Sequence, residues 1–139
     1  MPLFRPEEEV RVRELLDGLE RPVELVVALG PESTPLPGAR EIDFGAETVR
    51  IVEALSALSD KLTHRIEDEA DRYPAVFVRP DGEDAGLTYY GLPWGYELGS
   101  LIGAVREAGR AESSLSPESV EQLARLDRDL AIDVFVTPT

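Results

Sequence analysis

A short apolar run from Val23 to Leu29 constrains the fold of this chain more than any other segment. The run is rich in β-branched residues, Arg21-Pro22 precedes it, and Gly30-Pro31 ends it. A short apolar run between such breakers is typical of a strand buried on both faces of a sheet. The rest of the chain must therefore supply neighbouring strands and covering helices.

Helices are predicted on both sides of this run in the sequence. Pro6 and three following glutamates suit a helix N-terminus, and apolar residues then recur at helical spacing, which predicts a helix over residues 6–20. Residues 31–45 have the proline and glycine content of a loop. Helical spacing returns over residues 46–59 and predicts a second helix.

The second half of the chain predicts the remaining strands and a closing helix. Residues 61–67 alternate in polarity as a strand does, and residues 74–90 have the pattern of a β-hairpin with a turn at Asp81-Gly82. A helix follows over residues 94–108. The predicted fold is α/β, with a central mixed sheet of about four strands and helices on both faces, followed by a C-terminal helix and strand.

Composition limits the classes of partner. The chain has 139 residues and 42% hydrophobic content, enough for one domain with a core, and its formal net charge of -14 would repel nucleic acid and anionic membranes. Its apolar runs are too short to span a membrane and its N-terminus does not resemble a signal peptide, so we expect a cytoplasmic protein. No small-molecule substrate, cofactor or metal ligand set is evident.

The absence of cysteine restricts the chemistry. With no cysteine among 139 residues, the chain has no disulfide, no thiolate metal ligand and no thiol nucleophile. The acidic run from Glu67 to Asp71 lacks the glycine and ligand spacing of a calcium loop, so we interpret it as a solvated connector. His64 lies between Leu62 and Ile66 on the apolar face of its predicted strand, which favours a packed residue over a base or ligand.

Two segments resemble a known family. Tyr89-Tyr90-Gly91-Leu92-Pro93-Trp94-Gly95-Tyr96-Glu97-Leu98 resembles the segment that begins the last helix of the N-terminal thioredoxin-fold unit in protein disulfide oxidoreductases of the tandem, glutaredoxin-like type. It is also similar to the N-terminal region of the alkyl hydroperoxide reductase flavoprotein subunit. The segment from Leu126 to Thr139 resembles the approach to the Cys-x-x-Cys motif of the second unit in those proteins.

The resemblance implies a degenerate thioredoxin-like domain over residues 1–110. Residues 111–139 then form a linker, a helix that Ser116 and Pro117 begin, and a strand over residues 131–136 similar to the start of a second unit. The connector at residues 68–72 is short, so the helix usual at that place is expected to be reduced or absent. Because no thiol is present, the unit is expected to be redox-inactive and not an enzyme by itself.

The resemblance also implies a peptide-binding element at Tyr73, Pro74 and Ala75. In thioredoxin folds the loop before the third strand usually contains a cis-proline, and the backbone beside it pairs with an extended partner. Tyr73-Pro74 is placed to be that element. The alternative is that Pro74 only begins an edge strand.

Two further sets of residues are interface candidates. Gly95, Gly99 and Gly103 leave one face of the predicted helix nearly free of side chains, for close packing against the domain's own sheet or against another subunit. The terminal strand exposes an apolar edge if it stays unpaired, so it is a candidate for association with another chain. Its apolar candidates are Ile132, Val134 and Val136.

Three hypotheses for function follow. The first is a non-catalytic structural or partner-docking module linked to thiol-disulfide metabolism, acting on a protein partner or as a homodimer. The second is the N-terminal fragment of a protein disulfide oxidoreductase whose Cys-x-x-Cys unit follows Thr139. The third is an interaction or oligomerisation protein unrelated to redox chemistry.

Overall fold

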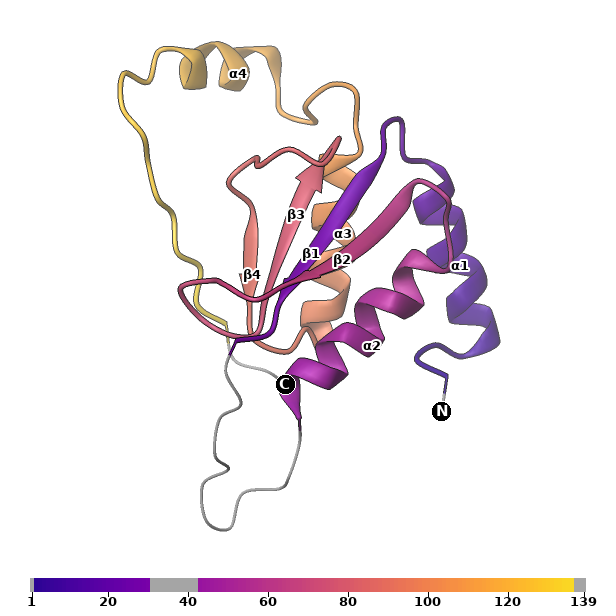
Figure 1. Cartoon of the computed structure of the whole chain (residues 1–139). Coiled ribbons are helices and arrows are strands. Elements are labelled where there is room, and N and C mark those ends of the chain that lie inside the picture. The colour runs from indigo at the N-terminus through magenta and orange to yellow at the C-terminus, as the bar shows by residue number, and fades with distance from the viewer. Residues whose placement is uncertain (1, 31–42, 137–139) are drawn as a thin grey trace.

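The computed structural model describes residues 2–30 and 43–136. It contains the elements predicted up to residue 126 in the predicted order (Figure 1). The helices are α1 (Pro6–Asp17), α2 (Phe44–Ser56), α3 (Tyr96–Ala108) and α4 (Pro117–Ala124), and the strands are β1 (Val23–Ala28), β2 (Leu62–Glu67), β3 (Ala75–Pro80) and β4 (Thr88–Tyr90).

The strands form one mixed sheet in the order β2-β1-β3-β4. β1 pairs with β2 in parallel, through Val23 opposite Leu62, and with β3 in antiparallel, through Val26 opposite Phe77. β3 and β4 form the predicted hairpin, with Val76 opposite Tyr89. β1 is central, and all its residues except Glu24 are fully buried, as its apolar run predicts.

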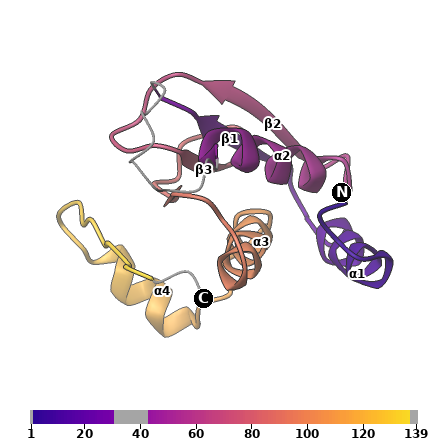
Figure 2. The ribbon, with the colours of Figure 1, turned by 90° about the horizontal axis from the view of Figure 1, so that it is seen from below.

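The main core lies on one face of the sheet. Side chains alternate between faces along a strand, so Val23, Leu25 and Val27 of β1 share a face with Val76 and Val78 of β3. All five belong to the main hydrophobic cluster, together with buried residues of α1, α2 and α3. Seen from below, these helices lie on the same side of the sheet (Figure 2).

This arrangement corrects the prediction of helices on both faces. A helix over the second face would have to come from the connector between β2 and β3, and residues 68–74 contain bends but no helical turn. The reduced connector expected from the resemblance is therefore confirmed, and its consequence is a sheet face over which no described helix packs.

Charged side chains occupy this second face. Arg65 Nε lies 3.1 Å from Glu24 Oε1, and the Arg65 guanidinium also contacts the Glu67 carboxylate. Arg79 Nη1 lies 3.8 Å from Glu67 Oε1, while the Arg79 guanidinium lies 5.3 Å from the ring centroid of Phe77. These long side chains place their charges at the surface over the buried strand residues beneath them.

Helix caps explain two of the boundaries. α2 begins two residues before the predicted start because Asp43 Oδ1 accepts a 2.9 Å hydrogen bond from the Ala46 amide. α4 begins after Ser116 as predicted, with Ser116 Oγ accepting a 3.2 Å bond from the Ser119 amide.

The predicted strand over residues 131–136 is wrong. The chain runs extended alongside β4 there without joining the sheet (Figure 1). The alternation of apolar and polar side chains in this segment favours a strand, but no described segment pairs with residues 131–136. Each residue of α4 is likewise exposed or half-exposed, so residues 111–136 stand apart from the core. Most of the loop predicted over residues 31–45, namely residues 31–42, lies outside the described residues, as does the end, Thr137-Pro138-Thr139.

Candidate functional site

The Tyr73-Pro74 peptide bond is cis, as the resemblance implies. The alternative, in which Pro74 opens an edge strand, is wrong because β3 lies between β1 and β4. Ala75 is fully buried and is paired with both Ala28 and Tyr90, so its backbone faces neighbours on both sides.

The ring of Tyr73 packs against the end of β1. Gly30 has a φ of +69°, and a Cβ at this position would lie 2.2 Å from Tyr73 Cγ. The Tyr73 hydroxyl accepts a 3.2 Å hydrogen bond from the Ala70 amide, while Pro74 O accepts a 2.7 Å bond from the Gly91 amide. The backbone of Tyr73 itself has no hydrogen bond to any described residue. Among the three candidates, Tyr73 is therefore the one whose backbone groups have no hydrogen-bond partner in the part of the chain that the structure describes.

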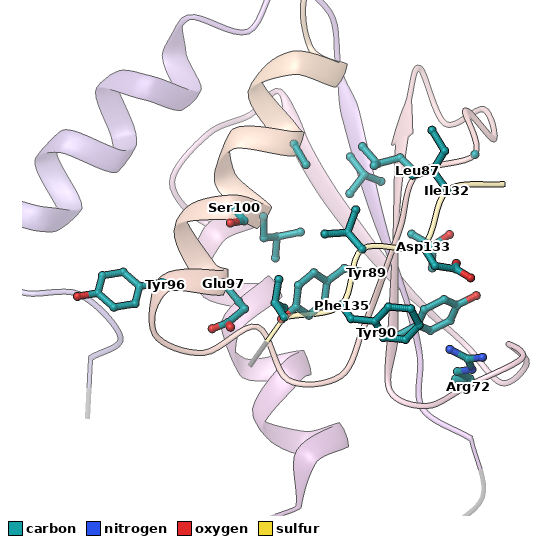
Figure 3. A pocket seen from close by; sticks show the side chains of 17 residues that line it. Arg72, Leu87, Tyr89, Tyr90, Tyr96, Glu97, Ser100, Ile132, Asp133 and Phe135 are labelled. Carbon is teal, nitrogen blue, oxygen red and sulfur yellow. The ribbon is translucent and has the colours of Figure 1, made fainter. Parts of the chain in front are cut away.

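A larger concave feature lies beside β4. This groove, the β4–α3 groove, has a volume of about 960 Å³. One wall is β4 with the residues just before it, a second is the first two turns of α3, and the extended segment from Ile132 to Val136 lies along the outside (Figure 3). Such a volume is within the usual range of ligand sites, and the open shape suits an elongated occupant.

Glu97 is the unusual residue of this groove. It lies in the first turn of α3, where a negative charge is favoured by the helix dipole, and only 7% of it is exposed. Its Oε2 atom is buried and has no hydrogen-bond partner among the described residues. A buried carboxylate oxygen without a partner is costly and uncommon in folded proteins.

Tyr89 lies beside Glu97 in the groove (Figure 3). Burial raises the pKa of the Tyr89 hydroxyl, and the negative charge of Glu97 raises it further, because both oppose formation of the phenolate. The carboxylate and the phenol therefore share one local environment. Glu97 was not among the residues singled out from the sequence, because an acid in a first helical turn is ordinary and its burial has no local signature.

We expect Glu97→Gln to lower the pKa of Tyr89. The substitution removes the smaller cause of the shift and keeps the larger, burial, so the pKa should fall but stay above the ordinary tyrosine value of about 10. NMR titration of the tyrosine ring carbons, with Tyr89→Phe to assign the signal, measures this. Glu14→Gln on α1 is the matched control and should leave the value unchanged. An unchanged Tyr89 pKa in Glu97→Gln would contradict the proximity of the two groups.

The glycine-lined face does not pack against the sheet. Gly99 and Gly103 are exposed, and a Cβ added at either would meet nothing within 4 Å, so the prediction of packing against the domain's own sheet is wrong for them. Gly95 is also exposed and precedes α3 with a φ of +62°. Contact of this face with another subunit stays a prediction.

The remaining candidate residues from the sequence are exposed in the structure. Ile132, Val134 and Val136 are 83%, 80% and 60% exposed, so the described residues cover little of these side chains. His64 lies on the edge strand β2 and is exposed, so the prediction of a packed residue is wrong. Within residues 2–30 and 43–136, no cluster of three or more histidine or acidic side chains suits a metal ion, and no helix is long and apolar enough to cross a membrane.

Comparisons with known proteins match this chain to parts of longer proteins. No family model matches the chain. Over 86% of its length it is 28% identical to the F subunit of alkyl hydroperoxide reductase from Xanthomonas campestris pv. phaseoli, and over 93% it is 25% identical to the corresponding protein of Staphylococcus aureus. The chain spans only 21% and 23% of these two relatives.

Solved structures show the same similarity in three dimensions. The NTD_N/C domain of alkylhydroperoxide reductase from Enterococcus faecalis aligns with a TM-score of 0.71 at 17% identity, covering 86% of this chain and 59% of that one. A protein disulfide oxidoreductase from Aeropyrum pernix aligns with a TM-score of 0.66 at 22% identity, covering 88% and 55%. The fold is thioredoxin-like. The predicted resemblance is thus confirmed, and this thioredoxin-like chain carries no cysteine.

Proposed function

We propose that this chain is a non-catalytic, cytoplasmic thioredoxin-fold module that docks a protein partner in thiol-disulfide metabolism. The observation that carries the proposal is a thioredoxin-like fold without cysteine: the similar proteins are named as redox enzymes or parts of them, yet this chain has no thiol. Thiol-disulfide exchange needs a thiolate as nucleophile and a second thiol to resolve the mixed disulfide. In this proposal those thiols belong to the partner.

Two features of the described residues support docking. The backbone of Tyr73, beside Pro74, has no hydrogen-bond partner among the described residues, and the β4–α3 groove lies next to the edge strand of the sheet. Backbone groups at a loop or sheet edge are common means of holding an extended partner. The peptide-binding candidates Tyr73, Pro74 and Ala75 thus remain part of the proposal, with Tyr73 as the residue that offers its backbone.

Two measurements test this function. The chain should show no turnover in an insulin-reduction assay with dithiothreitol, and clear turnover would overturn the non-catalytic assignment. Affinity capture with the full chain from its native host should enrich an identified thiol-redox protein such as a thioredoxin, a peroxiredoxin or a flavoprotein. Capture only of proteins unrelated to redox chemistry would favour the interaction-protein hypothesis instead.

A second candidate is that these residues form one unit of a longer disulfide oxidoreductase. It is supported by the partial coverage of the similar structures, 59% and 55% of their chains. In such a protein the Cys-x-x-Cys unit would follow Thr139. The intact mass of the protein purified from its native host distinguishes the two candidates, because a chain of 15.3 kDa would contradict the longer protein.

Association through the C-terminal segment is a related prediction. The apolar side chains of Ile132, Val134 and Val136 are largely exposed, and burying such surface between two chains is favourable. We expect a homodimer in multi-angle light scattering and a monomer after deletion of residues 130–139. A full-length chain that is monomeric at all concentrations tested would contradict this association.

A further inference from the structure

The Oε2 atom of Glu97 has no hydrogen-bond donor among the described residues, so a donor from another molecule could satisfy it. Glu97 is only 7% exposed and lines the β4–α3 groove. The start of α3 accounts for the negative charge at this position but leaves that oxygen unpaired. A donor that enters the groove would satisfy it, and a charged donor would do so most strongly.

The lining of the groove favours a cation. Tyr89 supplies an aromatic ring beside Glu97, and the face of such a ring attracts positive charge. The charged residues of the lining are two carboxylates, Glu97 and Asp133, and one guanidinium, that of Arg72, which lies 5.8 Å from the centroid of the Tyr90 ring. The whole chain carries a formal charge of -14, which attracts a basic partner over longer range.

The unpaired edge of β4 favours an extended peptide as the molecule that brings a positively charged side chain to Glu97. β4 is the last strand in the order β2-β1-β3-β4, and no backbone hydrogen bond joins its outer edge to any described segment. A peptide laid along such an edge pairs through its backbone and directs alternate side chains to one face. Tyr89 marks the face of β4 that is turned toward Glu97 and the core.

We propose that the β4–α3 groove binds an extended segment of a partner protein through a lysine or arginine side chain that pairs with Glu97. The inference rests on the proposed docking function and names the chemistry of its partner. A second copy of this chain is a poorer occupant. Its C-terminal residues 129–139 contain no lysine, arginine or histidine, so this segment brings no cation to Glu97.

Fluorescence anisotropy with two labelled peptides tests this proposal. Both alternate valine and threonine, and they differ only at the central position, which is lysine in one and uncharged norleucine in the other. We expect the full chain to bind the lysine peptide about tenfold more tightly, as one charge-assisted hydrogen bond requires. Glu97→Gln should abolish the difference between the peptides, while Glu14→Gln, the same change of charge on α1, should preserve it.

The possible outcomes are distinguishable. Equal affinity for the two peptides, no binding of either, or a lysine preference that survives in Glu97→Gln would overturn the proposal. The comparison of the two peptides on the unaltered chain needs no variant, so it stands even if Glu97→Gln fails to fold. Displacement of the peptide by self-association would assign the groove to a second copy and also overturn it. If Glu97→Gln captures a thiol-redox protein as strongly as the unaltered chain does, the pairing of the partner's cation with Glu97 is rejected. The proposed docking function would then still stand.

Discussion

Leu25→Ala is expected to lower the free energy of unfolding by about 2–5 kcal/mol. Leu25 is 0% exposed in the central strand β1, where it faces the cluster that α1, α2 and α3 cover. Truncation leaves a cavity that the surrounding strands cannot close, because β1 is paired on both sides. Domains of ordinary size have a total stability of about 5–15 kcal/mol, so the loss should be plain in a denaturant titration.

Leu123→Ala is the matched control for this substitution. Leu123 is 52% exposed on α4, which packs against no part of the core, so the same change should alter stability by less than about 0.5 kcal/mol. Comparable losses for the two variants would contradict the separation of residues 111–136 from the core. Such a result would mean that α4 is covered in solution by the domain or by another chain.

Gly30→Ala is expected to destabilise the protein by roughly 2–4 kcal/mol, because the backbone and the packing both oppose a side chain. The φ of +69° is unfavourable for alanine, and the new Cβ would lie within 2.2–2.5 Å of three ring atoms of Tyr73. Tyr73 would have to move, and its hydroxyl would then lose the hydrogen bond from the Ala70 amide. Thermal unfolding followed by circular dichroism measures the effect.

Gly86→Ala separates these two causes. Gly86 has a similar φ of +73°, but a Cβ there would meet nothing within 4 Å, so alanine should cost only the backbone term of about 1 kcal/mol. The difference between the two variants then reports the contact between Gly30 and Tyr73. Equal destabilisation would mean that the Tyr73 ring does not pack on the end of β1.

The order and type of the elements could be predicted because they depend on local patterns. The apolar run at Val23, the spacing of leucines in the helices and the Ser116-Pro117 cap each act over a few residues, and each appears where expected. The terminal strand could not be predicted in this way. Its alternation is a strand pattern, but a strand also needs a partner, and the described residues provide none.

The faces of the sheet and the groove depend on longer-range packing. The short connector at residues 68–72 indicated a missing helix, yet only the register of β1 against β3 shows that the main core lies on one face. The resemblance predicts the cis bond at Pro74, whereas the local sequence does not. The burial of Glu97 results from the approach of α3 to the hairpin, which no spacing within α3 reveals.

The uncovered face of the sheet also has a consequence for how this sequence can change. Glu67 contacts both Arg65 and Arg79, and Arg79 Nε is buried without a hydrogen-bond partner among the described residues. Loss of Glu67 would therefore leave the Arg79 guanidinium poorly compensated, whereas Arg65 would keep its contact with Glu24. A substitution of Glu67 is tolerated best when a charged residue that it contacts on β2 or β3 is substituted as well. We therefore expect related sequences to exchange the charges of β2 and β3 in matched pairs, whereas a helix-covered site such as Leu25 accepts only apolar replacements of similar volume.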